Sequence, residues 1–172
     1  MINSIAGIAV ALEEAMKPEF SQYTDQIIKN AQALSDELIN LDFNVITGGT
    51  DKHLILIDVR GKQKDGHIAA HLLEAADIIV NKNTIPFDKD GTPWRPSGLR
   101  IGTPSITTRG MKEKEMRQIA HLMNEVLSTE KIPPNLKTPG IIAKVMENKT
   151  ILEIKDKVHK LTQKFPIYKD IK

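Results

Sequence analysis

The part of this sequence best suited to hold a small ligand lies within residues 78–109, where polar and conformationally restricted residues separate short β-prone segments. Arg100 lies in one such segment between two glycines, so its guanidinium could be held rigidly beside backbone that a ligand can approach. This arrangement suits bidentate capture of a carboxylate. Asn83 carries a donor and an acceptor on a short stem, which suits the edge of a heterocycle. A structural loop, with Asn83 capping a turn and Arg100 in a surface ion pair, explains these residues equally well.

The five histidines do not form a recognisable metal site. His67 and His71 are four residues apart in a predicted helix, a spacing that metal ligands use, but no cysteine is available to complete a set. His53 begins an apolar strand, where we expect a hydrogen-bonded core or boundary residue. His121 and His159 lie in patterns typical of surface helices. We therefore expect no metal in this chain. Neither a glycine-rich phosphate loop nor a Gly-x-Ser-x-Gly elbow is present.

Composition excludes several classes of protein. The chain has 172 residues and no cysteine, which excludes disulfide frameworks, zinc–thiolate sites, iron–sulfur clusters and a cysteine nucleophile. Aromatic residues make up 4% of the sequence, too few for a platform that stacks single-stranded nucleic acid. No apolar run approaches the ~20 residues that span a bilayer, and the first residues lack the basic region of a signal peptide. We expect a soluble cytoplasmic protein.

Charge is unevenly distributed, although the whole chain has a formal net charge of +2. Residues 128–172 contain ten lysines and five acidic residues, so this segment is basic and the rest of the chain is slightly acidic. A basic tail can bind nucleic acid or an acidic lipid surface. More often it is the solvated face of helices. The lysines here stand singly among acidic and apolar residues, which favours the solvated face.

Apolar spacing predicts several helices. Apolar residues recur every three or four positions over residues 5–16 and again over residues 20–39, with a proline between the two runs. A shorter helix is predicted over residues 67–76. Thr107 or Thr108 can cap a further helix that carries a regular apolar stripe to about residue 127.

Short β-prone segments lie between these helices. We expect strands at residues 43–47, 53–59, 78–81 and 99–102. Both faces of the segment 53–59 are largely apolar, so this strand should be covered on both sides, with Asp58 at its end. The order of elements predicts an α/β protein of the α+β kind, with a small mixed or antiparallel sheet backed by helices on one side.

Prolines and glycines mark the irregular parts of the chain. Gly48 and Gly49 supply turn chemistry, and residues 84–97 contain three prolines and a glycine, which excludes regular structure there. Residues 128–140 are proline-rich and predict a linker. The basic segment 141–172 then predicts two short helices.

Five motifs occur in order along the chain: Ile8-Ala9-Val10-Ala11-Leu12, Gly48-Gly49-Thr50-Asp51-Lys52-His53-Leu54, Val80-Asn81-Lys82-Asn83-Thr84-Ile85-Pro86-Phe87-Asp88, Ser97-Gly98-Leu99-Arg100-Ile101-Gly102-Thr103-Pro104 and Thr107-Thr108-Arg109-Gly110. Together they closely resemble the serine hydroxymethyltransferase family, from about residue 5 to residue 127. The shared order of several separate motifs makes the resemblance specific. Past Ser128 the resemblance fades, although Lys164-Phe165-Pro166-Ile167-Tyr168 looks like the C-terminus of a family member.

This resemblance implies an enzyme that uses pyridoxal phosphate to move a one-carbon unit between serine and tetrahydrofolate, giving glycine and methylenetetrahydrofolate. It also implies the aminotransferase-like fold type I and a dimer or a pair of dimers. Arg100 matches the arginine that binds the carboxylate of the amino-acid substrate, and Asn83 matches an asparagine that contacts the folate. Residues 87–96 depart from the common pattern in length and in carrying Trp94-Arg95, so the details of that loop are not transferred.

The resemblance further indicates the C-terminal small domain of the family's structure. The family's Schiff-base lysine, the acidic partner of the ring nitrogen and the phosphate cradle lie N-terminal to the matched motifs, and Lys82 is not that lysine. We expect residues 1–17 to be a connecting helix, 18–127 the small domain, 128–140 a proline-rich linker and 141–172 a basic helical tail. No catalytic residue is expected in this chain, and alone it should be inactive.

Two interpretations of function remain. In the first, the chain is part of an active serine hydroxymethyltransferase, and Arg100 and Asn83 work beside the large domain of that enzyme, in the same or a separate chain. In the second, it is a stand-alone module without catalysis, which could bind nucleic acid through its basic tail. The presence of both Arg100 and Asn83 favours the first. We expect a homo-oligomer, with no membrane partner and no nucleic acid.

Overall fold

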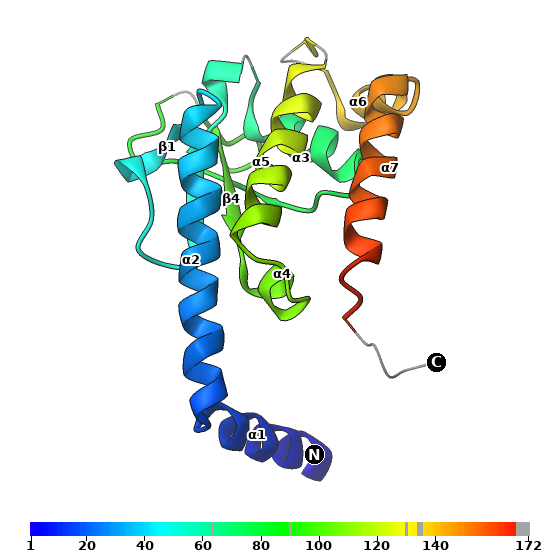
Figure 1. The fold of residues 1–172 in the computed structure, drawn as a ribbon. Coiled ribbons are helices and arrows are strands. Elements are labelled where there is room, and N and C mark those ends of the chain that lie inside the picture. Colours follow the sequence, from blue (N-terminus) through cyan, green and yellow to red (C-terminus); the bar gives the residue numbers. More distant parts are fainter. Residues whose placement is uncertain (63, 90, 130, 134–135, 168–172) are drawn as a thin grey trace.

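The computed structural model describes residues 1–62, 64–89, 91–129, 131–133 and 136–167; Pro134 of the predicted linker and Tyr168 of the C-terminal motif lie outside them. The described chain contains a four-stranded sheet in the order β1-β2-β4-β3, with helices packed on one face (Figure 1). This confirms the predicted class and the small sheet, whose pairings are antiparallel throughout. The strands are β1 (Asn44–Val45), β2 (Leu54–Asp58), β3 (Asn81–Asn83) and β4 (Gly98–Gly102).

Alternation of side chains along the strands divides the sheet into an inner and an outer face. The outer face is largely open: Leu54 is 40% exposed there, and Leu56 is half-buried. The prediction that residues 53–59 are covered on both sides is therefore wrong, because the described helices cover only one of the two apolar faces. The buried apolar side chains of the inner face are Val45, Ile55, Ile57, Leu99 and Ile101.

Helices α2 (Pro18–Asn40) and α3 (Gly66–Ala75) pack against the strands, and α5 (Glu113–Ser128) packs against both of these helices. α2 begins at a proline, whose missing N–H is not needed in the first turn. The Asp65 carboxylate caps α3 by accepting the backbone N–H of Ile68 at 2.8 Å. The helices predicted over 20–39 and 67–76 are confirmed. The buried stripe of α2 includes Ile27, Ala31, Leu34 and Leu38.

The helix predicted to follow Thr107 or Thr108 begins later than expected. Both threonines lie in a separate short helix, α4 (Pro104–Thr108), and α5 begins only after Lys112. The Thr107 hydroxyl donates to the carbonyl of Thr103 at 2.8 Å, one turn back. A threonine hydroxyl can bond within a helix as well as cap one, so residue type alone did not separate the two roles.

The strand predicted over residues 78–81 is displaced to β3. The residues before β3 instead close α3: the N–H of Ile78 donates to the carbonyl of Leu73 at 2.9 Å, and Asp77 has a left-handed φ of 57°. Ile78 and Val80 are partly buried against the core. Their β-branched side chains therefore contribute to core packing here and not to strand pairing.

A buried hydrogen-bond network fixes the end of β4 against α2. Asn30 is 0% exposed, and its Nδ2 donates to the Thr107 hydroxyl at 2.8 Å and to the carbonyl of Met111 at 2.9 Å. Thr103 is also fully buried and donates to the carbonyl of Ile27 at 3.0 Å. Buried polar groups that are paired in this way have few alternative arrangements. The network therefore holds α4 and the end of β4 in one position relative to α2.

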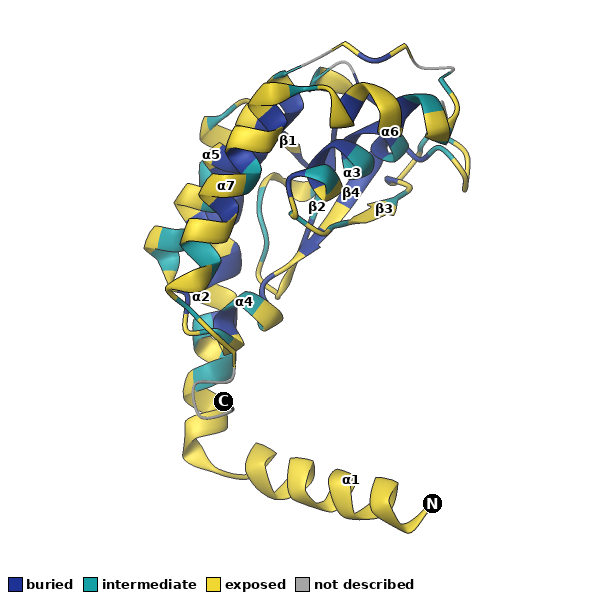
Figure 2. Ribbon diagram, turned by 90° about the vertical axis from the view of Figure 1, so that its right-hand side faces the viewer, coloured by how far each residue is buried: buried dark blue, intermediate teal, exposed yellow. Residues whose placement is uncertain are grey.

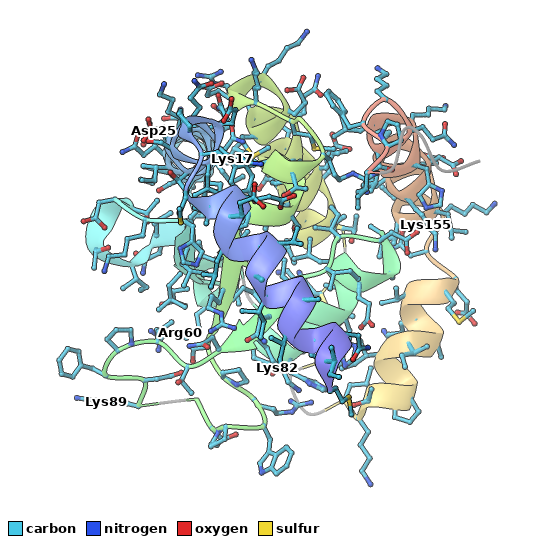
Figure 3. All side chains as sticks on the ribbon, turned by 90° about the horizontal axis from the view of Figure 1, so that it is seen from below. Lys17, Asp25, Arg60, Lys82, Lys89 and Lys155 are labelled. Atoms are coloured by element: carbon cyan, nitrogen blue, oxygen red, sulfur yellow. The ribbon has the colours of Figure 1, made fainter. Side chains whose placement is uncertain are left out.

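Residues 84–97 contain no helix or strand over their described part, as their prolines predict. Asp88 organises the base of this loop. Its carboxylate accepts the N–H of Gly91 at 2.8 Å, the N–H of Ser97 at 3.0 Å and the Ser97 hydroxyl at 2.7 Å. Lys89 lies on the part of the loop that extends away from the helices (Figure 3).

The C-terminal segment forms the two predicted helices, α6 (Thr138–Met146) and α7 (Lys149–Gln163). On α7, Lys155 pairs with Asp77 at 3.2 Å. The division of the chain at residues 17, 127 and 140 stays a prediction. The buried side chains of α6 and α7 join the same core cluster as the sheet and α5, and they are Ile141, Val145, Ile151, Ile154 and Val158.

Helix α1 (Ile2–Ala15) projects from the start of α2 and buries none of its residues (Figures 1 and 2). The predicted first helix is thereby confirmed. Its apolar side chains include Ile5, Ile8 and Leu12, which are 61–67% exposed. A helix with apolar residues on most sides is normally buried, so α1 is an uncovered surface of the described chain. No described helix, α1 included, is both long enough and apolar enough to cross a membrane.

Candidate functional site

The outer face of the sheet carries a row of side chains across three strands. Leu56 of β2 lies opposite Arg100 of β4, and Arg100 lies opposite Asn81 of β3, so these three side chains share one face. Asn83 lies two residues further along β3 and therefore points to the same face. The fold thus brings together the two residues selected from the sequence, with Arg100 on an inner strand and Asn83 on an edge strand.

Arg100 and Asn83 line one groove of about 430 Å³ on this face. The groove is also lined by outer residues of β2, by the loop of residues 46–52 and by Pro86. Arg100 borders a second hollow of about 370 Å³, which Asn81 also lines. An arginine in this place can reach a ligand in the groove without any change in the backbone.

The Arg100 side chain is exposed and makes no hydrogen bond or ion pair with any residue that the structure describes. Two other arginines near the sheet are occupied. Arg60, in the short helix η2 (Arg60–Lys62), pairs with Asp58 at 2.8 Å, and Arg95 pairs with Asp65 at 3.3 Å. Burial acts to raise the pKa of Asp58, but the hydrogen bonds and charge of Arg60 outweigh it and lower the pKa. The donors of Arg100 are thus free to bind an anion from outside the described chain.

Asn83 is half-buried, and its Nδ2 donates to the carbonyl of Thr84 at 2.7 Å. Its side-chain oxygen has no hydrogen-bond partner among the described residues. Gly98 lies opposite Asn83 in the sheet register. A Cβ on Gly98 would lie 2.5 Å from a methyl of Ile85 and 2.7 Å from the carbonyl of Ile57, distances that no side chain can accept. Glycine at position 98 therefore allows β3 and Ile85 to pack against β4, which sets the position of Asn83.

The loop of residues 46–52 contributes a wall of the groove with unusual backbone. It contains the short helix η1 (Ile46–Gly48), in which Thr47 and Gly48 both have φ of 69°, and Gly49 follows with φ of 155°. The turn predicted from the two glycines is confirmed. Lys52 also lines the groove and was not selected from the sequence. Its sequence signal was only a place in a turn before a strand, which does not reveal where the side chain lies.

The donor set of the groove fits an amino-acid carboxylate and the polar edge of a heterocycle, but it does not fit pyridoxal phosphate. A phosphate cradle needs several converging N–H groups or cations, and a Schiff base needs a lysine in a shielded position. Lys52 is the one lysine among the described groove residues, and it is exposed; none of the described α-helices lines the groove. We therefore assign the cofactor to no residue of this chain.

His67 and His71 form part of a polar cluster, with their rings edge-on at 4.6 Å. His67 Nε2 lies 3.1 Å from the Thr138 hydroxyl of α6, and Lys82 Nζ lies 3.3 Å from His67 Nδ1. An ammonium group can only donate, so Nδ1 accepts, Nε2 carries the proton, and the ring is neutral. Across the described residues, no group of three or more His, Cys, Asp or Glu could hold a metal ion.

The other histidines lie at the surface. His53 is exposed and precedes β2, so the expectation of a core or boundary position is wrong. His121 and His159 lie on surface helices, as predicted, beside Glu37 at 2.9 Å and Asp77 at 2.5 Å respectively.

Protonation of His67 is expected to destabilise the fold. Burial first, and then the charges of His71 and Lys82, lower the pKa of His67 below its usual value of 6.5, although Asp65 acts in the opposite direction. Between the lowered pKa and the usual value, the unfolded chain binds more protons than the folded chain. The free energy of unfolding should therefore rise with pH across that window. Urea unfolding from about pH 5 to about pH 7.5 should show a smaller rise for His67→Gln than for the wild type.

The matched control for this experiment is His53→Gln, because His53 is exposed and has no side-chain partner among the described residues. This variant should keep the wild-type pH dependence. An equal rise in the wild type and in His67→Gln would contradict the role of His67.

The fold and the groove define a class of protein: a small α+β domain with a groove on the open face of its sheet, bordered by an arginine and an asparagine. A family model described as serine hydroxymethyltransferase matches residues 1–123. The cytosolic serine hydroxymethyltransferase of Oryctolagus cuniculus is 50% identical over 122 residues, which are 71% of this chain and 25% of that protein. The chain belongs to the serine hydroxymethyltransferase family.

Two bacterial relatives extend the similarity through α6 and α7. The serine hydroxymethyltransferase of Coxiella burnetii (strain CbuG_Q212) is 40% identical over 171 residues, or 99% of this chain and 37% of that protein. That of Myxococcus xanthus (strain DK1622) is 41% identical over 168 residues, or 98% of this chain and 36% of that protein. The expectation that the similarity fades past Ser128 is therefore corrected. The chain spans between a quarter and two fifths of the length of these relatives.

Proposed function

We propose that this chain provides the substrate-binding side of a serine hydroxymethyltransferase, which moves a one-carbon unit between serine and tetrahydrofolate. The observation that carries this proposal is the guanidinium of Arg100, which has no partner among the described residues and lies on the open face of the sheet, in the same groove as Asn83. Arg100 binds the carboxylate of serine or glycine with two parallel hydrogen bonds. Asn83, whose side-chain oxygen has no partner within the described chain, contacts the polar edge of the folate.

In this proposal the chemistry on the cofactor takes place outside this chain. Pyridoxal phosphate supplies an electron sink when it is bound, and its lysine and phosphate cradle belong to the family's large domain. Residues 1–17 connect to that domain, residues 18–127 form the small domain, and a linker over 128–140 leads to the tail of residues 141–172. The isolated chain is inactive, and the working enzyme is a cytoplasmic homo-oligomer of the aminotransferase-like fold type I.

Two uncovered surfaces support a large partner domain. The outer face of the sheet exposes Leu54 beside the groove, and α1 exposes apolar side chains along its whole length. Contiguous apolar surface of this kind marks a place that another part of a protein covers. A domain that docks on the outer face would also close the groove over a ligand held by Arg100, which would exclude water from the carboxylate.

A chimera tests the proposal. This chain would replace the matching residues of the Coxiella burnetii relative, and the purified protein would be assayed for conversion of serine to glycine with tetrahydrofolate and pyridoxal phosphate. The chimera should turn over serine, and the isolated chain should not. The same chimera with Arg117→Ala should stay active, because Arg117 is exposed on α5 and has no side-chain partner among the described residues.

A chimera that folds and retains pyridoxal phosphate, yet converts no serine, would contradict the proposal. That result would favour the alternative function, a non-catalytic binding module.

A further inference from the structure

A partly enclosed cavity of about 160 Å³ lies between the sheet and the helices α4, α5 and α7, away from the open face of the sheet. Its walls include Ile101 of β4, Ile106 of α4, Val158 of α7, and Met111 and Met123 next to and within α5. Four of these five side chains are at most 7% exposed and belong to the main core cluster, and Ile106 is partly buried against it. The cavity therefore reaches into the core, and it opens to the surface beside exposed residues such as Ile79 and Ser105.

The lining of the cavity defines the chemistry of an occupant. The side chains that surround it are almost all aliphatic or thioether groups, and the polar ones are Asp77, Ser105 and Thr162. Asp77 is already paired with Lys155 and His159. A charged ligand would lose its hydration and gain no partner in return. A neutral apolar molecule has no charge to desolvate. It would also make the dispersion contacts that the wall side chains lack while the space is empty.

The volume sets the size of the occupant. An apolar cavity of about 150 Å³ engineered into another protein stays free of water and binds benzene or xenon. The present cavity has a similar volume and a mostly apolar lining, and it is partly open to the surface, so it has room for one six-membered ring or a branched aliphatic group of similar bulk.

We propose that this cavity is a binding site for a small neutral apolar molecule with a single ring. The site is independent of the proposed enzyme function, since none of its walls includes Arg100 or Asn83. It nevertheless lies directly behind the strand that carries Arg100: Val80, Ile101 and Gly102 line both this cavity and the hollow that Arg100 borders on the other side. An occupant would thus contact the strand from the core side.

The six methionines of the chain provide an internal test. Met111 and Met123 line the cavity, whereas Met116 is equally buried and does not line it, and Met16 and Met146 are exposed. In a protein labelled with ¹³C at the methionine methyls, benzene should shift the resonances of Met111 and Met123 saturably through its ring current. The resonances of Met116, Met16 and Met146 should stay unchanged, and benzoate, the charged analogue, should shift none of them.

Two outcomes would overturn the proposal: no saturable shift of Met111 and Met123, or equal shifts at Met116 and the exposed methionines.

A second experiment measures benzene binding to variants. Ile119→Phe on α5 fills part of the cavity and should weaken benzene binding about tenfold or more. The same substitution at Ile142, which is 45% exposed on α6 and does not line the cavity, should leave binding unchanged. Equal affinity of both variants would also refute the site. Should Ile119→Phe not fold, the methionine shifts of the wild type decide alone.

Discussion

Replacing Arg100 with alanine is expected to lower kcat/KM for serine by about 2–4 kcal/mol of transition-state free energy, roughly 30- to 900-fold, in the chimeric enzyme. The guanidinium has no partner among the described residues and borders the groove, so in the proposed role its removal would leave the substrate carboxylate without its charge-assisted partner. The kcat/KM of Arg100→Lys should lie between that of the wild type and that of Arg100→Ala, because an ammonium keeps the charge and loses the planar pair of donors.

Initial rates at varied serine concentration measure this effect. KM should rise in both Arg100 variants, since the lost contact holds the substrate before the reaction as well as during it. The control is Arg117→Ala, which removes an exposed arginine with no partner among the described residues and should leave kcat/KM unchanged. An Arg100→Ala enzyme with wild-type kcat/KM would reject the carboxylate role while leaving the family assignment intact.

Replacing Asn30 with alanine is expected to lower the free energy of unfolding by about 2–4 kcal/mol. Asn30 is fully buried, and its Nδ2 serves both the Thr107 hydroxyl and the carbonyl of Met111. Without the Asn30 side chain, the Met111 carbonyl loses a buried donor, and a void is left beside α4. Asn30→Asp should also destabilise the fold, because a carboxylate cannot donate to either acceptor.

Urea denaturation of the isolated chain measures this loss. Asn40→Ala provides the control on the same helix, since Asn40 is exposed at the end of α2 and should change stability by less than about 0.5 kcal/mol. Equal midpoints for Asn30→Ala and Asn40→Ala would show that the buried network contributes nothing to stability.

Local patterns in the sequence were sufficient for the long helices. The apolar spacing of residues 20–39 corresponds to the buried stripe of α2, because a helix that packs on a core must repeat its apolar residues every three to four positions. The same reasoning is weaker for short segments. Ile78 and Val80 have β-branched side chains that suit a strand, yet both pack on the core, and the N–H of Ile78 closes α3.

The candidate site was predictable in its residue types and not in its extent. Arg100 and Asn83 were selected because their chemistry suits a ligand, and the structure places both on one groove. Lys52 was missed, because its place in the groove beside Arg100's strand depends on how a turn folds against a strand far away in the sequence. Asn30 was missed for a similar reason, since its partner Thr107 lies 77 residues further along the chain.

The alternation of side chains in β4 restricts how its length can change during evolution. Leu99 and Ile101 point into the core, while Arg100 between them points to the groove. Insertion or deletion of one residue between Gly98 and Gly102 would exchange the two faces of the strand downstream of the change. When the change precedes Arg100, the guanidinium would enter the core, and an aliphatic side chain would replace it in the groove. Substitutions in β4 can therefore accumulate one at a time, whereas changes in its length must come in pairs.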